Sequence, residues 1–190
     1  MKRIIVLLYV LLSACGNIPQ KSYELSSDVP GLFLNVFASV DSMQIKINKN
    51  AKSVRNIQLK KIGGLYYTTR IIDAFDRDTS EEKDAPSYIL LLNNRNDTSF
   101  VITYPPSSYP SIPAESEDCS ITIKKFNSDV YYTKKTSLLD KHYFDLYFYD
   151  AEYRIIAILY SRINKQYLFV DKKADYLPDI MSHINTKRGL

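Results

Sequence analysis

The sequence has few of the residues from which metal, cofactor and catalytic sites are usually built. Its 190 residues include two histidines, two cysteines, five glycines and no tryptophan. Neither His142 nor His183 has another histidine or cysteine at the spacing of a zinc site, which needs three or four converging ligands. It contains no glycine-rich phosphate loop and no G-x-S-x-G motif. The sequence therefore predicts no metal, no cofactor and no enzymatic activity.

Two single residues, His142 and Cys119, are candidates for a chemical role. His142 follows Asp140 closely enough for a general base with an orienting carboxylate, but a histidine at the start of a strand more often faces solvent. Cys119 follows Glu117 and Asp118, whose carboxylates disfavour a reactive thiolate. We therefore expect Cys119 to be a buried packing residue.

The chain also lacks an apolar run long enough to cross a membrane as a helix. Residues 4–12 form a run of nine apolar residues, whereas a spanning helix needs roughly 20. Lys2 and Arg3 precede this run, and Leu12-Ser13-Ala14-Cys15 ends it. A positive start, a short apolar centre and small residues at the end are typical of a secretory signal.

The segment Leu12-Ser13-Ala14-Cys15 resembles the lipobox of bacterial lipoproteins. The resemblance implies that residues 1–14 are a signal peptide and that Cys15 carries two or three acyl chains such as palmitate, enough for stable attachment to a membrane. Gly16 stands where an aspartate would favour the inner membrane, so the outer membrane, on its periplasmic side, is the expected location. A plain secretion signal that ends beside a cysteine is the alternative.

The mature chain would have a nearly balanced charge and a single thiol. Removal of residues 1–14 leaves 176 residues and lowers the formal charge from +4 to +2. A chain of that length can form one domain that buries about 70% of its unfolded surface. Nucleic-acid binding would require a strongly basic face, so we expect no nucleic-acid partner. Cys119 alone cannot form an internal disulfide.

Sixteen tyrosines, eight phenylalanines and recurrent short runs of alternating polarity indicate β structure. They predict an antiparallel β-sandwich or open barrel of about ten strands, with a short C-terminal helix at 177–187. Residues 15–30 are predicted to be a lipidated, flexible tether and residues 31–190 a single β domain. The expected strands lie at 32–40, 43–49, 54–62, 64–72, 87–94, 97–104, 119–126, 129–136, 142–149, 152–160 and 165–170, with a hairpin at Arg95-Asn96.

Charged residues are segregated along the chain. Residues 42–72 contain seven basic residues and no acid, whereas residues 73–86 are rich in acids. Opposite charges gathered in this way can steer a charged partner, although lysines on solvent-facing strand positions would give the same pattern. The acidic loop lacks the glycine and the glutamate of a calcium loop in register. The predicted partner-binding residues are Asp73, Asp76, Asp78, Glu81, Glu82 and Asp84.

Three functional hypotheses follow. The first is a non-enzymatic, membrane-anchored module that binds a protein of the envelope. In size, address and β build, such a lipoprotein resembles the periplasmic immunity proteins that neutralise effectors delivered by type VI secretion, and the resemblance implies that the acidic loop contacts the effector. The second is a structural or assembly lipoprotein of an envelope complex. The third is an envelope hydrolase that uses His142.

Overall fold

The computed structural model describes residues 21–49, 54, 56–69, 88–102, 119–138, 142–162 and 165–188. These residues form twelve antiparallel strands of one curled sheet and one C-terminal helix, α2 (Leu177–Arg188). The predicted all-β class and the helix are confirmed. The strands are β1 (Lys21–Ser27), β2 (Phe33–Ala38), β3 (Ser42–Ile47), β4 (Ile57–Ile62), β5 (Leu65–Thr69), β6 (Tyr88–Leu92), β7 (Thr98–Ile102), β8 (Cys119–Lys125), β9 (Val130–Ser137), β10 (Phe144–Asp150), β11 (Ile155–Arg162) and β12 (Lys165–Val170).

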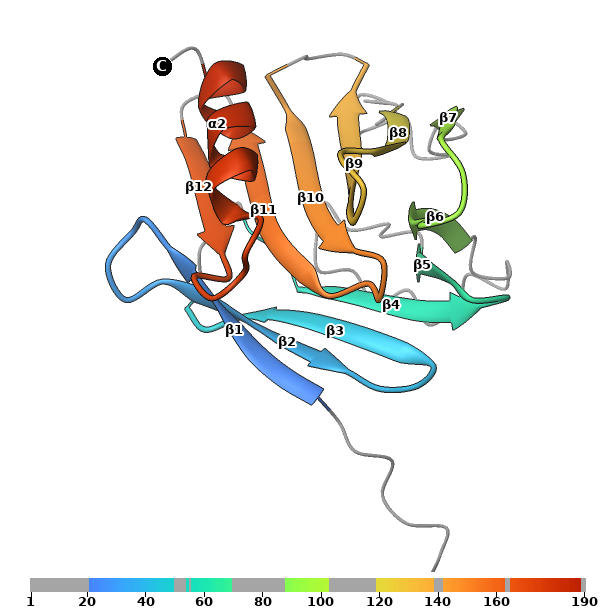
Figure 1. Ribbon diagram of the computed structural model, residues 1–190, viewed down its shortest axis with the longest axis horizontal. Coiled ribbons are helices and arrows are strands. Elements are labelled where there is room, and N and C mark those ends of the chain that lie inside the picture. The colour runs from blue at the N-terminus through green and yellow to red at the C-terminus, as the bar shows by residue number, and fades with distance from the viewer. Residues whose placement is uncertain are drawn as a thin grey trace, which may run out of the picture.

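The first and last strands of the chain meet in the middle of the sheet. The order is β6-β5-β4-β3-β2-β1-β12-β11-β10-β9-β8-β7, so each strand pairs with its neighbours in sequence except at one place. The exception is β6 and β7, which lie at the two edges of the sheet although a short connection joins them. The result is a half-barrel in which β1 and β12, from the two ends of the chain, are paired (Figure 1). The edge strands β6 and β7, from the middle of the chain, are not paired with each other.

The predicted tether is wrong for residues 21–27, which form β1. This strand pairs with β2 over six residues and with β12 through Ser26 and Ser27. Its apolar alternation is limited to Tyr23 and Leu25, too short a pattern to be recognised among serines, a lysine and a glutamate. Leu25 is nevertheless fully buried in the core, and backbone pairing on both sides holds the polar residues in the strand.

The predicted hairpin at Arg95-Asn96 is also wrong. β6 pairs with β5 and β7 pairs with β8, and no ladder joins β6 to β7. Two other turns join consecutive strands that do pair. The Gly63-Gly64 turn joins β4 to β5 with both glycines in the left-handed region (φ 58° and 85°), where glycine carries no Cβ penalty. The turn at Asp150-Ala151 joins β10 to β11.

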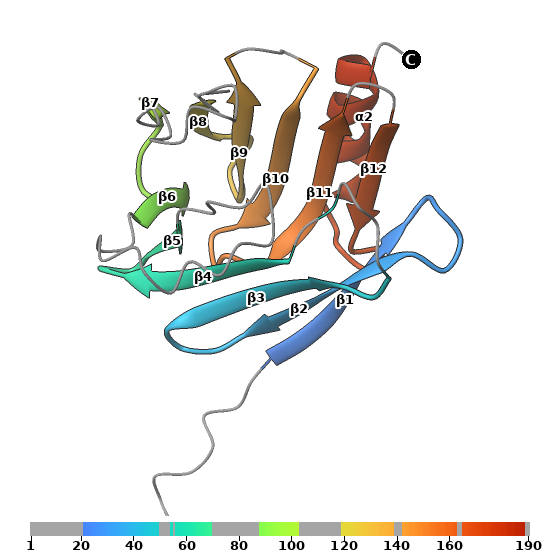
Figure 2. The ribbon, with the colours of Figure 1, turned by 180° about the vertical axis from the view of Figure 1, so that it is seen from behind.

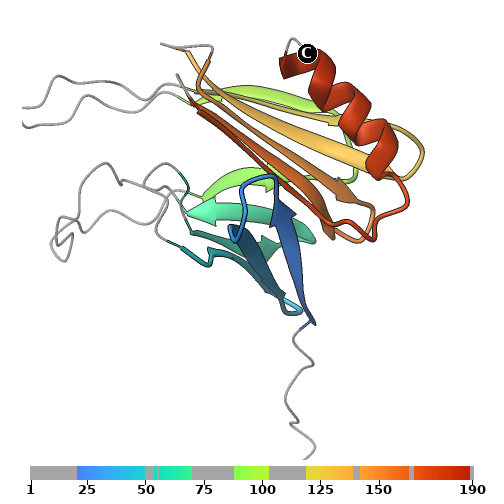
Figure 3. The same ribbon diagram turned by 90° about the vertical axis from the view of Figure 1, so that its left-hand side faces the viewer.

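The sheet has a first half, β1–β6, and a second half, β7–β12. The two halves enclose the larger hydrophobic core. Strands β1–β4 run across one end of β9–β12 rather than along them (Figure 2), as in orthogonal sheet packing. Along β10, Tyr147 and Tyr149 join the core between the halves, whereas Leu146 and Phe148 join a second core under α2. Ile180 and Ile184 of α2 complete that second core. The helix therefore covers the outer face of the second half of the sheet (Figure 3).

Strand β11, in the second half of the sheet, lies between the two cores. Seven of its eight residues are buried, because one face meets the first half of the sheet and the other meets α2. A continuous apolar run is the sequence pattern of a strand covered on both faces. Within the described residues, no helix has the length and apolar character needed to span a membrane.

Candidate functional site

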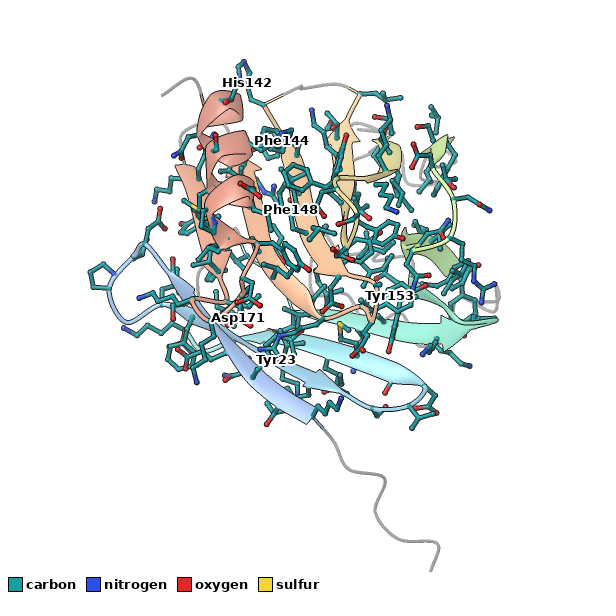
Figure 4. The ribbon with its side chains drawn as sticks, in the orientation of Figure 1. Tyr23, His142, Phe144, Phe148, Tyr153 and Asp171 are labelled. Atoms are coloured by element: carbon teal, nitrogen blue, oxygen red, sulfur yellow. The ribbon has the colours of Figure 1, made fainter. Side chains whose placement is uncertain are left out.

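The predicted functional residues fall into two groups. Cys15 and the six acidic residues Asp73, Asp76, Asp78, Glu81, Glu82 and Asp84 lie outside the described residues. Cys119 is buried at the start of β8, and His142 is exposed just before β10, at one end of the molecule (Figure 4). The described part of the chain holds no group of three or more His, Cys, Asp or Glu residues that could bind a metal ion.

At the opposite end of β10, four turns from distant parts of the sequence meet. We call this group the turn cluster: residues 63–64, 93–97, 125–129 and 150–154. Its centre is the connection 93–97, which bonds to each of the other turns. Asn94 Nδ2 donates to the Ala151 carbonyl (2.6 Å), and Arg95 Nη2 donates to the Gly63 carbonyl (2.9 Å). Asp97 Oδ1 accepts from the Lys125 amide (3.0 Å).

Gly64 makes one of these contacts sterically feasible. A Cβ atom on Gly64 would collide with the Arg95 guanidinium, and the residue also has a positive φ. The Gly63-Gly64 turn thus serves the turn cluster as well as the β4–β5 hairpin, because it allows Arg95 to lie against the backbone.

A buried hydrogen-bond network underlies the turn cluster. The Tyr149 hydroxyl accepts from the Asn93 amide and donates to the Asn93 carbonyl, each at 3.0 Å. Thr133 Oγ1 on β9 donates to the Leu91 carbonyl at 2.5 Å. Burial raises the pKa of Tyr149 to about 12, which keeps its hydroxyl protonated. Because Tyr149 and Thr133 belong to the second half of the sheet, the network ties the β6 edge to that half.

Tyr153 is the strained residue of the turn cluster. Its φ of 66° lies in the left-handed region, which costs a residue with a side chain roughly 1–2 kcal/mol. The ring stacks on Tyr149 (centroids 6.0 Å apart) and meets Tyr66 edge-on (5.1 Å). Its hydroxyl donates to Asn94 Oδ1 at 2.6 Å. Strained residues of this kind concentrate at functional sites, and here the strain positions a buried ring below exposed turns.

The outer surface of the turn cluster carries charges of both signs. Lys61 lies over the rings of Tyr66 and Tyr153, at 5.5 and 5.9 Å from the centroids. The exposed residues of the turn cluster include Arg95, Asn96, Asp97, Lys125, Ala151 and Glu152. Rigidly held turns with mixed charges on a β scaffold are suited to contact another protein. The described residues of the cluster include no histidine or cysteine, and they form no set of three or more side chains that could hold a metal ion.

The predicted charge segregation is visible only in part. Lys46 on β3 and Lys60 on β4 are exposed on the outer face of the first half of the sheet, where they lie over the rings of Phe37 and Tyr88. Glu24 lies on the same face, one strand beyond Asn35, which pairs with Lys46. The face is therefore mixed rather than uniformly basic within the described residues.

Sequence reasoning did not find the turn cluster. The sequence predicts a hairpin at Arg95-Asn96, although the five consecutive polar side chains of residues 93–97 offer several donors and acceptors to neighbouring turns. Nothing in "DAEYR" indicates a left-handed tyrosine, because that backbone position normally calls for glycine or asparagine. Comparisons with family models, curated proteins and solved structures give no match for this chain.

Proposed function

We propose that the protein is a lipid-anchored lipoprotein of the bacterial cell envelope that binds another protein and catalyses no reaction. The observation that carries the binding role is the turn cluster, in which a buried network and a strained tyrosine hold four exposed turns in fixed positions. The anchor rests on the residues from Lys2 to Cys15. An extended chain spans at most about 3.3 Å per residue, so acylated Cys15 would hold β1 within roughly 20 Å of the membrane.

Within this class, we propose an immunity protein that neutralises a secreted effector. Its acidic residues, Asp73 to Asp84, would form a second contact with the effector. Carboxylates can occupy a basic cleft of an effector, and complementary charge speeds association. The turn cluster and the acidic residues can be tested separately, because substitutions can alter one without the other.

The anchor is tested by metabolic labelling of the full chain with palmitate, followed by fractionation of the envelope. We expect label in the wild type and none in Cys15→Ser, and we expect the variant to leave the membrane fraction. Residues 21–190 contain every described strand, so the variant should retain the circular dichroism of the wild type. Equal labelling of the two proteins would contradict the anchor.

The binding role is tested by capture of a partner from envelope extract on the tagged chain, with identification by mass spectrometry. One bait carries Lys125→Glu and Glu152→Lys, which reverse two exposed charges of the turn cluster and preserve the net charge. A second bait has Asp76, Asp78, Glu81 and Glu82 changed to serine. One stoichiometric protein lost from the first bait would support the turn cluster, and one lost from the second would support the acidic contact. Absence of any partner with the wild type would overturn the binding role.

An assembly role is the second candidate, and the edge strand β7 favours it. β7 pairs with β8 on one side, and no described strand pairs with its other side. Its sequence "TSFVI" has no charge or proline to discourage strand addition, and Val101 is 59% exposed. A partner strand could extend the sheet here. Val101→Lys should abolish capture of an envelope component in this case, whereas Val101→Thr should retain it.

A further inference from the structure

The turn between β2 and β3 exposes a valine at its tip. Val40 is 64% exposed, more than any other large hydrophobic residue in the described part of the chain. The turn is held by the Ser39 amide, which donates to the Ser42 carbonyl (2.8 Å), and by the Ser42 amide, which donates to Ser39 Oγ (3.1 Å). Tight turns favour glycine, proline and short polar residues. Val40 serves neither the turn nor the core, so its apolar surface remains available to a partner.

A second exposed aliphatic residue lies beside Val40. The β3–β4 ladder continues beyond its last residue pair, because the Lys61 amide donates to the Asp41 carbonyl at 2.7 Å. The same register places Val40 opposite Ile62, the last residue of β4, whose side chain is 41% exposed. Single exposed apolar residues are common on protein surfaces, whereas adjoining ones indicate a contact surface. Here the two come from different elements and meet at one end of the first half of the sheet.

The strand β1 begins at the same end of the first half. Lys21, its first residue, pairs with the last residue of β2, two positions before Val40. Cys15 is six residues before Lys21, so acyl chains on Cys15 would lie within about 20 Å of this end. Tyr23 of β1 lies in the lower part of the molecule and His142 at its top (Figure 4). We call residues 21, 38–42 and 60–62 the anchor end.

The charge of the anchor end is positive. Lys21, Lys60 and Lys61 contribute three cations, and Asp41 is the one carboxylate. None of these four residues forms an ion pair with another described residue. The Asp41 side chain instead accepts from the Ser39 hydroxyl at 3.0 Å. A lysine close to an anionic lipid surface favours binding by about fivefold, so the anchor end combines aliphatic tips with the charge that such a surface attracts.

We propose that the anchor end lies on the surface of the membrane. Val40 and Ile62 insert among the lipid headgroups, and the lysines lie beside anionic lipid phosphates. A membrane is also the partner that an acylated Cys15 would bring within reach of this end. The inference rests on the proposed anchor and adds to it a fixed orientation, in which the end that carries His142 points away from the membrane.

The test uses the absence of tryptophan from the sequence, because a single introduced tryptophan then reports on one position. The full chain is produced in a bacterium, purified in detergent and reconstituted into vesicles of phosphatidylglycerol and brominated phosphatidylcholine. We expect the emission of Val40→Trp to shift to shorter wavelength and to be quenched by the bromine atoms. Tyr143→Trp, next to His142 at the opposite end, is the control and should not be quenched. Equal emission from the two variants would overturn the proposal.

Lysine variants in the Val40→Trp background show whether the native residues hold the turn at the membrane. Lys21→Gln and Lys60→Gln should each shift the equilibrium away from the membrane-bound orientation by about fivefold, and quenching should fall accordingly. Lys165→Gln, at the exposed start of β12, is the matched control and should leave the quenching unchanged. Unchanged quenching in the first two variants would mean that the introduced tryptophan alone holds the turn, and it would overturn the proposal.

Flotation of the vesicles on a density gradient tests the anchor separately. If the protein floats with the vesicles and the tryptophan at position 40 is not quenched, the anchor stands and the orientation proposed for the anchor end is wrong. If the full chain does not float with the vesicles, the anchor and the membrane contact are both wrong.

Discussion

At the scale of single residues, Tyr153 shows how local strain and tertiary contacts balance. The turn that contains it is stabilised by Asp150, whose Oδ1 atom accepts from the amides of Glu152 (2.8 Å) and Arg154 (2.9 Å). This leaves Tyr153 in a backbone conformation that favours glycine. Two ring contacts and the hydrogen bond to Asn94 offset the cost. The strain therefore persists because the surroundings fix the ring.

Two substitutions at Tyr153 separate the strain from the contacts. Tyr153→Phe keeps the rings and loses the hydrogen bond, so we expect a loss of about 1 kcal/mol in the free energy of unfolding. Tyr153→Gly loses the buried ring, which costs about 3–5 kcal/mol, and regains about 1–2 kcal/mol of backbone strain. Its net loss should be about 2–3 kcal/mol, measured by urea unfolding. A glycine variant as stable as the wild type would show that the ring contacts are worth no more than the backbone strain.

At the scale of the elements, the edge strand β6 depends on contacts with the opposite half of the sheet. It has one strand neighbour, β5, and its second tie is the hydrogen bond from Thr133 Oγ1 to the Leu91 carbonyl. Ile89 of β6 also packs with Ile121 and Ile123 of β8. Side-chain contacts, and not a backbone ladder, therefore hold β6 against the second half of the sheet.

Removal of this side-chain tie should loosen β6 selectively. Thr133→Val preserves the shape and leaves the Leu91 carbonyl without its partner, so we expect a loss of about 1–3 kcal/mol in stability. Amide hydrogen exchange should accelerate in β6 more than in β2 and β3. The control is Thr122→Val, whose hydroxyl makes an exposed contact with Ser99 at 3.4 Å, and it should cost less than about 0.5 kcal/mol. Equal effects of the two variants would contradict a special role for Thr133.

The strand β1 is the element that joins the two halves, although only two residue pairs link it to β12. Its side chains strengthen that junction. The Tyr23 hydroxyl accepts from the Ile155 amide at 2.7 Å, and the Arg154 guanidinium lies 4.6 Å from the Tyr23 ring centroid. Arg154 in turn pairs with buried Asp171, and the hydrogen bond to Asp171 raises the pKa of Arg154. Tyr23 and Asp171 lie close to each other at this junction (Figure 4).

Shortened chains test the contribution of β1. A chain that begins at Lys21 retains every described strand, and we expect it to fold like the full chain. A chain that begins at Val29 loses fully buried Leu25, which alone is worth about 2–5 kcal/mol, and it exposes the edges of β2 and β12. We expect it to lose cooperative unfolding and near-ultraviolet circular dichroism. If the shorter chain retained both, β1 would be dispensable.

The elements also show which parts of the fold a sequence can predict. Strands such as β3 and β8 were predicted because Ile45, Ile121 and Ile123 alternate with polar residues and face the core. β1 was missed because most of its stabilisation comes from backbone pairing and from distant partners. The separation of β6 from β7 was not predicted either, because adjacent strands with a short connection usually form a hairpin. Here the contacts of Asn93, Asn94 and Arg95 direct the connection across the sheet.

At the scale of the whole molecule, the turn cluster depends on the complete fold. The turn cluster combines residues that are as much as 91 positions apart, from Gly63 to Arg154. No local pattern encodes such a site, because its members meet only when the sheet curls. The sequence alone therefore predicted the fold class and not the turn cluster.

The buried tyrosines make the stability of the whole molecule sensitive to alkaline pH. Burial raises the pKa values of Tyr23, Tyr147 and Tyr160, and that of Tyr149 to about 12. An unfolded tyrosine ionises near pH 10. Between these values the folded state holds protons that the unfolded state releases, so stability is complete below about pH 10 and falls as the pH rises. Tyr149 alone should account for roughly 2–3 kcal/mol by pH 12.

We therefore expect urea unfolding midpoints to be constant up to about pH 10 and to fall steeply above it. Tyrosinate absorbance should show two classes of side chain. The exposed rings should ionise first, and the buried rings should ionise together with loss of the fold. If all the tyrosines ionised in one step near pH 10 while the circular dichroism stayed native, the buried hydroxyls would be accessible to water.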